Sequence, residues 1–392
     1  MSAPVIVSAC RTPIGTAFKG TLTQTSALDL AGVVLAEAVE RSGAPADAFD
    51  DVILGESMYG GGVIARYAAV AAGLTEVPGM AVNRHCATSL SSLCMAAGSI
   101  AAGMDQLVIA GGVTSASTAP RTLWRIGVSD EWEEAFSPSH PDRADAPNVD
   151  MSVTVGWNAA RSRGVSREEM DDWAHRSHER AVAAQDAGLF DSEIVPVPVL
   201  LPDGTTARFE RDEHPRRGVP REKLAALKVL HPEIEGFSIT AANSSGVNDG
   251  AAALAVASEA RSGELGLPVL GRVLSWASVG VDPHDTGLAP IKAIPLALKR
   301  AGLSIADVDL WEINEAFAVV PLVACRELGI DDGIVNVSGS GCSLGHPIAA
   351  TGARMVVTLT HELGRRGGGI AVAAMCAGGG MGTAVVLDIA SV

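Results

Sequence analysis

The sequence repeats its own plan, and a repeat limits the architectures that the chain can adopt. Residues 31–57 read as a helix, a Gly stop, an Ala-Asp loop and an apolar strand, and residues 293–315 give the same order. A second pair, residues 82–112 and 335–380, reads in both cases as strand, Gly/Ser turn, helix, Gly stop, apolar strand and Gly turn. We therefore expect two halves of similar plan, each rich in β-α-β units.

The expected strands are apolar along their whole length, as in LVIAGG (107–112) and IAVAAM (370–375). Such strands are typical of sheets that helices cover on both faces. A chain of 392 residues is long enough for two cores of this kind. We predict an α/β fold with an N-terminal half over residues 1–268 and a C-terminal half over residues 269–392.

Residues 118–241 have a different composition. They hold four of the six Trp residues and many charges, and residues 166–188 show the apolar spacing of a helix. A helix with an apolar stripe needs a surface to cover, which makes a flexible linker the weaker alternative. We predict a loop or cap domain inserted in the N-terminal half.

The chain is acidic, with 45 Asp and Glu against 29 Lys and Arg and a formal net charge of −16. An acidic surface repels a phosphate backbone, so we expect no nucleic-acid partner. No apolar run reaches the roughly 18 residues of a membrane helix, and the first residues read as a strand and a turn, not as a signal peptide. The six cysteines form neither a CxxC pair nor a zinc spacing, so we expect a cytoplasmic protein with reduced thiols and no metal site.

Three Gly-rich segments invite other functions and do not fit them. GSGCSLG (339–345) has its third Gly one position too late for GxGxxG, CAGGGMG (376–382) lacks that spacing, and no Gly-Lys pair exists for a P-loop. GCSLG matches the nucleophile elbow of α/β-hydrolases, with Ser343 as the nucleophile. No Asp or Glu lies between Ser343 and His361, so the hydrolase order of Ser, acid and His is incomplete.

Cys86 is a stronger candidate for chemistry. It follows an apolar strand and opens a helix over residues 87–102. Free N–H groups and the helix dipole at such a position lower a thiol pKa toward roughly 3.5–7.5. An inert buried cysteine is the alternative for Cys86, and Cys94, inside the same helix, fits that alternative well.

Three further polar residues lie at strand ends of the repeated cores. His346 lies at the start of a second helix, Cys376 precedes a glycine turn with unobstructed N–H groups, and Asn314 follows an apolar strand. Each is a weak signal by itself. Because ligands bind at this edge of open α/β sheets, we expect these residues and Cys86 to share one site.

Four motifs, in this order, resemble the active-site loops of the thiolase family: NRHCATSL (83–90), NEAFA (314–318), GHPIAATG (345–352) and CAGGGMG (376–382). The likeness extends through VIVSACRTPIG, DEHPRRG, AANSSGVNDGAA and GVDPHDTGLAP, and so covers nearly the whole chain. It implies a five-layer αβαβα sandwich of two duplicated halves, with a loop domain inserted in the first.

The resemblance also implies a reaction. Thiolases are acyl-CoA C-acetyltransferases of lipid metabolism and β-oxidation, which cleave a 3-ketoacyl-CoA with coenzyme A or run the reverse Claisen condensation. By resemblance, Cys86 carries the acyl group after activation by His346, and Cys376 moves the α-proton. His346 and a water held by Asn314 stabilise the enolate, and the backbone N–H groups of Cys86 and Gly378 bind the oxygen of the tetrahedral intermediate.

The family's substrate contacts carry over to four more positions. Ser245 matches a serine that contacts pantetheine, and Phe317 lines the acyl pocket. Arg216 aligns with a basic residue near the nucleotide, although a charged run such as DEHPRRG also fits a solvated surface. Met151 matches a loop-domain methionine, and Asp150 stands where short-chain biosynthetic members often have His, which disfavours a strict acetoacetyl-CoA enzyme. The implied partners are coenzyme A thioesters and further copies of the chain in a homodimer or homotetramer, with no metal or redox cofactor.

The chain departs from the family pattern at several positions. Ser89 replaces the Gly of the CxSG motif, and Ala349 or Ala350 replaces a Gly of the GHPxGxSG motif. The pocket shape and the preferred acyl chain length therefore stay open. Two alternatives also stay open: a decarboxylating ketoacyl synthase, which has no second cysteine as base, and a catalytically silent binder of acyl-CoA or lipid.

Overall fold

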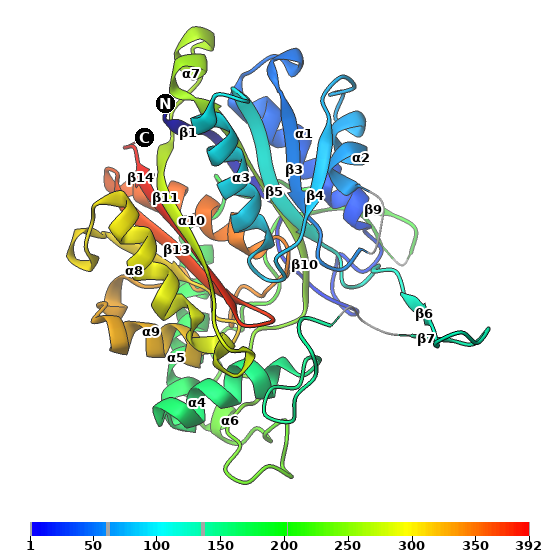
Figure 1. Cartoon of the computed structure of the whole chain (residues 1–392), viewed down its shortest axis with the longest axis vertical. Coiled ribbons are helices and arrows are strands. Elements are labelled where there is room, and N and C mark those ends of the chain that lie inside the picture. The colour runs from blue at the N-terminus through cyan, green and yellow to red at the C-terminus, as the bar shows by residue number, and fades with distance from the viewer. Residues whose placement is uncertain (1, 60–62, 135–137, 202, 392) are drawn as a thin grey trace.

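The computed structural model describes residues 2–59, 63–134, 138–201 and 203–391. Its main sheet is mixed, with strand order β4-β3-β5-β10-β1-β11-β14-β13-β12 (Figure 1). The N-terminal half supplies β1 (Pro4–Arg11), β3 (Asp51–Gly55), β4 (Gly79–Val82), β5 (Leu107–Thr114) and β10 (Asn248–Ser258), with a short β2 (Gly15–Thr16) beside β10. The C-terminal half supplies β11 (Gly271–Gly280), β12 (Leu310–Ile313), β13 (Gly369–Ala377) and β14 (Met381–Ile389).

The two halves of this sheet follow one plan. β3 runs parallel to β5 as β12 runs parallel to β13. β10 lies antiparallel to both β5 and β1, as β14 lies antiparallel to both β13 and β11. The halves join where β1 pairs with β11 at Val5 and Ile6. The predicted duplication is therefore confirmed.

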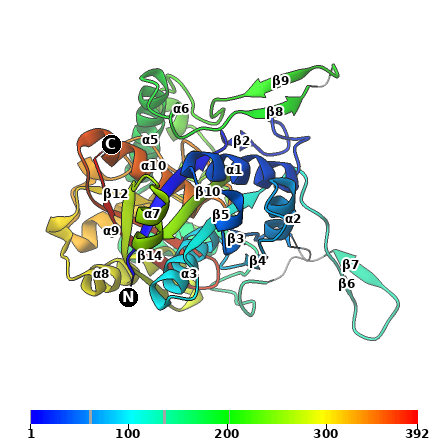
Figure 2. The same cartoon turned by 90° about the horizontal axis from the view of Figure 1, so that it is seen from above.

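Helices cover both faces of each half (Figure 2). One core cluster joins the outer face of the N-terminal strands to α1 (Ala27–Ser42) and α2 (Ile64–Ala71). Another joins the outer face of the C-terminal strands to α8 (Ala289–Ala301) and α9 (Val319–Leu328). Between the two sets of strands lie α3 (Thr88–Ala102) and α10 (Thr351–Arg366), which pack on both. These layers are the predicted five-layer αβαβα sandwich.

The sequence explains where several of these helices begin and what they bury. In α1, Ser26 accepts the Asp29 N–H while the Asp29 side chain accepts the Ser26 N–H, which caps the first turn. α10 is buried over most of its length although it carries several polar residues, and Met355, Val356 and Val357 are fully buried. Strands from both halves pack on it, and its last turn, with Arg365 and Arg366, is exposed.

The segment between β5 and β10 holds the predicted insertion. It contains the hairpin β6 (Leu123–Arg125) and β7 (Trp132–Glu134), a π-helix (Ser152–Trp157), α4 (Asn158–Arg163), α5 (Arg167–Asp186), the hairpin β8 (Val197–Leu200) and β9 (Thr206–Phe209), and α6 (Arg221–Ala225). The predicted helix over residues 166–188 is confirmed as α5, and Ser166 caps it with Glu169. The domain boundaries themselves stay a prediction.

The remaining elements are short. They are α7 (Glu259–Leu265) and the 3-10 turns Ala46–Ala48, Pro283–Leu288, Ile305–Asp307 and Asp332–Ile334. Within the described parts of the chain, no helix is long and apolar enough to cross a membrane.

Candidate active site

Cys86 lies in the loop between β4 and α3. The preceding residue, His85, has a left-handed φ of 45°, which turns the chain sharply before the helix. Cys86 is half-buried. Its sulfur accepts hydrogen bonds from the backbone N–H of Gly378 and from its own backbone N–H. A residue of the first half and a loop of the second half therefore meet at this sulfur.

The predicted low pKa of Cys86 is wrong for the resting thiol. Burial raises the pKa of Cys86 to about 11, and the N–H groups of Gly378 and Cys86 only partly oppose this effect. The first N–H groups at the helix start are not free, because Ala87 N donates to Arg84 O and Thr88 N donates to His85 O. The thiol is therefore protonated at neutral pH and needs a base to become a nucleophile.

Cys376 lies near the end of β13 and is buried. Burial raises its pKa, and the neighbouring charge of Cys86 raises it further. Cys376 also lies two residues before Gly378, whose N–H meets the Cys86 sulfur. The structure thus brings both predicted cysteines to one place, and it keeps Cys376 as a protonated thiol until a neighbouring group changes charge.

His346 lies at the turn before α10, and its ring tautomer can be read from its neighbours. The Thr351 hydroxyl donates to Pro347 O at 2.8 Å, so its oxygen accepts the Nδ1–H of His346 at 2.7 Å. Nε2 is then a bare acceptor, buried and without a hydrogen-bond partner among the described residues. Burial, and then the positive charge of Arg354, lower the pKa of His346 to about 4. His346 is therefore a neutral base with a free Nε2.

Asn248 fixes the backbone of this turn. Its Oδ1 accepts the His346 N–H at 3.0 Å, and its Nδ2 donates to Gly15 O at 2.9 Å. A Cβ on Gly345 would lie 2.4 Å from the Asn248 side chain, so only glycine fits beside it. Sequence reasoning missed Asn248, although it lies in the AANSSGVNDGAA segment.

Asn314 is buried at the end of β12. Both polar atoms of its carboxamide lack a hydrogen-bond partner within the described residues. A buried amide in this state is suited to hold a water or a substrate oxygen. Asn314 and the Nε2 of His346 are therefore two unused polar groups at the predicted site.

Glu315, the next residue, was missed by the sequence analysis. Its carboxylate is buried and accepts four hydrogen bonds, from Trp173 Nε1 (2.8 Å), Ser177 Oγ (2.7 Å), Asn336 Nδ2 (2.9 Å) and the Cys342 N–H (3.0 Å). These donors come from α5 and from two loops of the C-terminal half. Glu315 therefore fixes the chain next to Asn314, and the adjacent Glu in NEAFA was the only signal for it.

The glycine turn after Cys376 is open for close approach. A Cβ on Gly378 would lie 3.7 Å from Cγ of His85 and 3.8 Å from Sδ of Met151. Gly379 has a φ of 83°, and a Cβ there would lie 2.6 Å from Ser139 O. Met151 is thus placed at the site as predicted, and His85 is a neighbour that the sequence analysis did not single out.

The segment that holds Ser245 also contacts Phe317 and His346: Ser244 bridges to Phe317, and Val247 bridges to His346. Ser245 N donates to Ala316 O at 3.0 Å, and Phe317 is buried with its Cδ1 2.9 Å from where a Cβ on Gly156 would lie. The strand-like stretch after Ser245 pairs with His346 through Val247. The assignment of Ser245 to pantetheine and of Phe317 to the acyl pocket stays a prediction.

Arg216 lies elsewhere on the insertion. Its side chain is exposed, its backbone N–H donates to His178 Nδ1 at 3.1 Å, and it lines a hollow of about 270 Å³ together with α5 residues. None of the candidate catalytic residues lines that hollow. The contact of Arg216 with a nucleotide stays a prediction.

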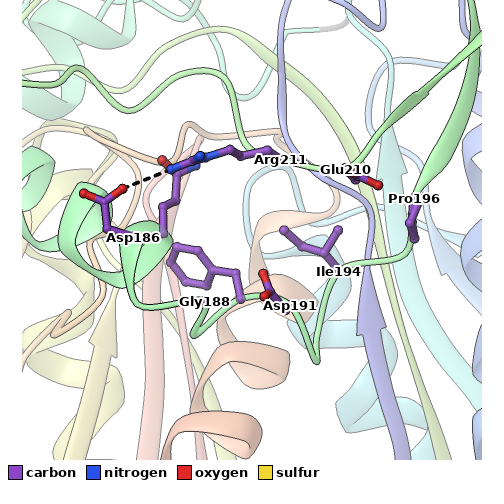
Figure 3. A pocket seen from close by; sticks show the side chains of 9 residues that line it. Asp186, Gly188, Asp191, Ile194, Pro196, Glu210 and Arg211 are labelled. Atoms are coloured by element: carbon purple, nitrogen blue, oxygen red, sulfur yellow. Dashed lines mark hydrogen bonds and ion pairs between the residues drawn. The ribbon is translucent and has the colours of Figure 1, made fainter.

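A larger hollow of about 530 Å³ lies where α5 ends, near the β8–β9 hairpin (Figure 3). Asp186 and Arg211 on its rim form an ion pair at 3.2 Å. Neither cysteine of the site lines it. This hollow is not part of the candidate active site.

Ser89 and Ala349, which depart from the family pattern, pack where α3 meets α10. Ser89 is fully buried, and its Oγ accepts the Ala353 N–H at 2.9 Å. Ala349 N donates to Thr114 Oγ1 at 2.8 Å. Both residues therefore make hydrogen bonds in the core, Ser89 through its hydroxyl and Ala349 through its backbone N–H.

Ser343 does not act as a nucleophile elbow. It is fully buried, and its Oγ bonds to Ser177 Oγ at 2.7 Å and to Ser340 O. This hydroxyl belongs to the network around Glu315.

Two family models cover almost the whole chain. The thiolase N-terminal domain matches residues 4–260, and the thiolase C-terminal domain matches residues 267–389.

Individual proteins match over the same span. The chain is 39% identical to an acetyl-CoA acetyltransferase of Cupriavidus necator, over 99% of this chain and 100% of that protein. It is 38% identical to a beta-ketoadipyl-CoA thiolase of Acinetobacter baylyi, over 98% of each. A solved structure, the acetyl-CoA acetyltransferase of Bacillus anthracis, has a TM-score of 0.89 at 37% identity and 99% coverage of both chains.

Proposed function

The chain belongs to the thiolase family, and from this premise we propose that it is an acyl-CoA C-acetyltransferase working through an acyl-cysteine. It cleaves a 3-ketoacyl-CoA with coenzyme A, or runs the reverse Claisen condensation. The observation that carries the proposal is the contact of the Cys86 sulfur with the Gly378 N–H, two residues from the second cysteine, Cys376. The names of the relatives, acetyl-CoA acetyltransferase and beta-ketoadipyl-CoA thiolase, describe the same reaction class.

In thiolysis, Cys86 attacks the 3-keto carbon while its proton passes to Nε2 of His346. The oxygen of the tetrahedral intermediate is bound by the N–H groups of Cys86 and Gly378. Collapse of this intermediate breaks the bond between C2 and C3, leaving an acyl group on Cys86 and the enolate of acetyl-CoA. The free Nε2 of His346 supports this role, because it can accept the proton without losing another hydrogen bond.

The second cysteine completes the proton balance. Cys376 donates its proton to C2 of the enolate, whose oxygen is held by His346 and by a water on Asn314. Acetyl-CoA leaves, and the Cys376 thiolate takes the proton of the incoming coenzyme A thiol. The resulting coenzyme A thiolate attacks the acyl-Cys86 thioester, and the Cys86 thiolate leaves with the proton that His346 has held since the first step. The buried, unpaired carboxamide of Asn314 supports the water site.

Substrate binding uses residues around this centre. We assign the pantetheine contact to Ser245, the acyl wall to Phe317 and Met151, and a nucleotide contact to Arg216. No step changes an oxidation state, so the reaction needs no redox cofactor, and the enolate is stabilised by hydrogen bonds without a metal.

The acyl chain length is the open part of the assignment. Asp150, which stands before Met151, lies 2.8 Å from His231 Nε2 and accepts the Ser152 hydroxyl. This charged pair beside the acyl wall supports substrates other than acetoacetyl-CoA alone.

The two alternatives are less favoured. A decarboxylating ketoacyl synthase does not use a second cysteine as a base, whereas here Cys376 lies beside Cys86. A silent binder has no need of a free basic nitrogen on His346, and Ser89 does not obstruct Cys86.

We further propose a homo-oligomer in the cytoplasm. The β6–β7 hairpin exposes large apolar side chains, namely Leu123, Trp124, Ile126, Val128 and Trp132. Exposed apolar patches of this kind mark contact surfaces. One relative is named as the cytosolic acetyl-CoA acetyltransferase of Mus musculus. Light scattering of the wild type and of Trp124→Ser should show a larger mass for the wild type.

The proposed reaction is tested by detecting the covalent acyl-enzyme. Incubation with acetyl-CoA should add one acetyl group to the intact protein, and peptide mapping should place it on Cys86. A panel of 3-ketoacyl-CoAs of graded length, assayed for thiolysis, then gives the chain-length preference. An unmodified protein after incubation would contradict the proposed function.

A further inference from the structure

His85 is a polar side chain at the acyl end of the site without an assigned task. Its backbone is fixed on both sides, because His85 N donates to Asn83 Oδ1 at 2.8 Å and His85 O accepts the Ser57 hydroxyl at 3.1 Å. The left-handed φ of 45° is uncommon for a residue other than glycine. The direction in which the side chain leaves the backbone is therefore set by the loop that also holds Cys86.

The imidazole lies beside Gly378, whose N–H contacts the Cys86 sulfur. A Cβ on Gly378 would lie 3.7 Å from Cγ of His85 and 3.8 Å from Sδ of Met151. If an acyl group on Cys86 has its carbonyl oxygen on the Gly378 N–H, its chain extends from the sulfur between these two side chains. Its first few carbons therefore meet a thioether on one side and an imidazole on the other.

The imidazole is available for a hydrogen bond. None of the described residues donates to or accepts from its ring nitrogens. The neighbouring His140 is already occupied, since its Nδ1 bonds Ser139 Oγ at 2.8 Å and its Nε2 bonds Ala146 O at 2.9 Å. Burial and the charge of His140 both lower the pKa of His85, so its ring is neutral at neutral pH. A neutral imidazole can donate or accept one hydrogen bond and carries no charge to attract an anion.

We infer that His85 is a specificity-determining residue that hydrogen-bonds an uncharged oxygen, such as a hydroxyl, within the first few carbons of the transferred acyl group. The inference rests on the proposed function and names the substrate class for it: acyl groups oxygenated near the thioester. An apolar acyl chain would leave the imidazole unpaired in a partly buried pocket, which costs binding in the transition state.

The experiment compares the rates at which three acyl-CoAs acylate Cys86, followed by quenched intact mass. Butyryl-CoA is the apolar substrate, 3-hydroxybutyryl-CoA adds one hydroxyl, and succinyl-CoA adds a carboxylate. We expect the wild type to prefer 3-hydroxybutyryl-CoA over butyryl-CoA by roughly three- to tenfold, the range of one hydrogen bond. In His85→Leu this ratio should fall to about one.

Two further variants keep the test independent of folding. His85→Asn tolerates the left-handed backbone and retains a hydrogen-bonding amide, so it should keep part of the preference. Met151→Leu changes the opposite wall without removing a hydrogen-bonding group, and should change both rates by the same factor.

The outcomes separate the two proposals. An equal ratio in the wild type and His85→Leu would overturn the role of His85. A preference for succinyl-CoA that depends on His85 would overturn the uncharged ligand. If not even acetyl-CoA modifies Cys86 in the wild type, the proposed reaction itself is wrong.

Discussion

The two halves of the molecule have equivalent strand and helix ends, and these ends differ in what they leave unpaired. At the end of β3, Glu56 accepts the Ile64 N–H at 2.9 Å, whereas at the end of β12 the Asn314 carboxamide is unpartnered within the described residues. At the end of β5, Thr114 Oγ1 accepts the Ala349 N–H at 2.8 Å, whereas β13 carries the Cys376 thiol at the equivalent end.

Polar groups at the strand ends therefore have a structural role in one half and a proposed catalytic role in the other. In the N-terminal half, Glu56 and Thr114 at strand ends hold neighbouring loops, and the start of α3 offers the Cys86 sulfur as a reactive atom. In the C-terminal half, the equivalent positions supply the proton-handling groups of the proposed site, His346, Cys376 and Asn314. In the proposed mechanism, one half thus provides the acyl carrier, and the other moves protons around it. The predictions below test this division.

The largest effect should come from the acyl carrier. Cys86→Ala removes the nucleophile, and we expect thiolysis to fall by roughly 10⁴-fold or more and the acyl adduct to disappear. Cys94→Ala is the matched control, because Cys94 lies in the same α3 helix and is buried in the core. Substantial turnover by Cys86→Ala would show that the N-terminal half does not carry the acyl group.

Replacement of the second cysteine should split the reaction in two. In Cys376→Ala we expect acetyl-CoA still to acylate Cys86, while complete thiolysis falls by roughly 10² to 10⁴-fold, the range for loss of a general acid or base. Intact mass gives the first step and a turnover assay gives the second. If Cys376→Ala lost the adduct as completely as Cys86→Ala, the division of tasks between the halves would be wrong.

A smaller effect should follow from the residue that orients His346. Thr351→Val removes the oxygen that accepts Nδ1–H, and we expect acylation of Cys86 to slow by roughly tenfold, as for loss of one hydrogen bond. Thr351→Ser should restore the rate. Thr360→Val is the control in the same helix, because the Thr360 hydroxyl only bonds Val356 O. Equal rates in Thr351→Val and Thr360→Val would show that Thr351 does not orient His346 for catalysis.

The smallest effect is in the pH profile. Burial and Arg354 lower the pKa of His346 to about 4, and the neutral ring is the base. The rate of Cys86 acylation should therefore stay nearly constant as the pH falls from about 8 to about 5, and decline only below that as the ring becomes protonated. A half-loss near the ordinary histidine pKa would show that His346 is not held neutral by its surroundings.

Much of the fold could be predicted from the sequence. The repeat of elements and the fully apolar strands predicted two covered sheets, and Ser166 with Glu169 gave the start of α5. These signals are local, because capping and strand burial depend on residues close together in the chain. The four motifs also contain Cys86, Cys376 and Gly378, which the structure brings together.

The electrostatics of the site could not be predicted in the same way. The pKa of Cys86 depends on burial by both halves and on an N–H from Gly378, which no local pattern reports. The roles of Asn248 and Glu315 arise from partners on distant loops and on α5. The place of His85 before Cys86 is the one hint that the sequence gives to a role in the site. Its contact with the Gly378 turn depends on the tertiary fold and could not be predicted.

The layer that α3 and α10 share between the two halves has a consequence for co-translational folding. The N–H that contacts the Cys86 sulfur belongs to Gly378, which is synthesised after both α10 and β13. A nascent chain that ends before α10 would hold the proposed acyl carrier without its proposed proton partners. We therefore expect catalytic competence only after α10, β13 and the Gly378 turn have been synthesised and packed against α3.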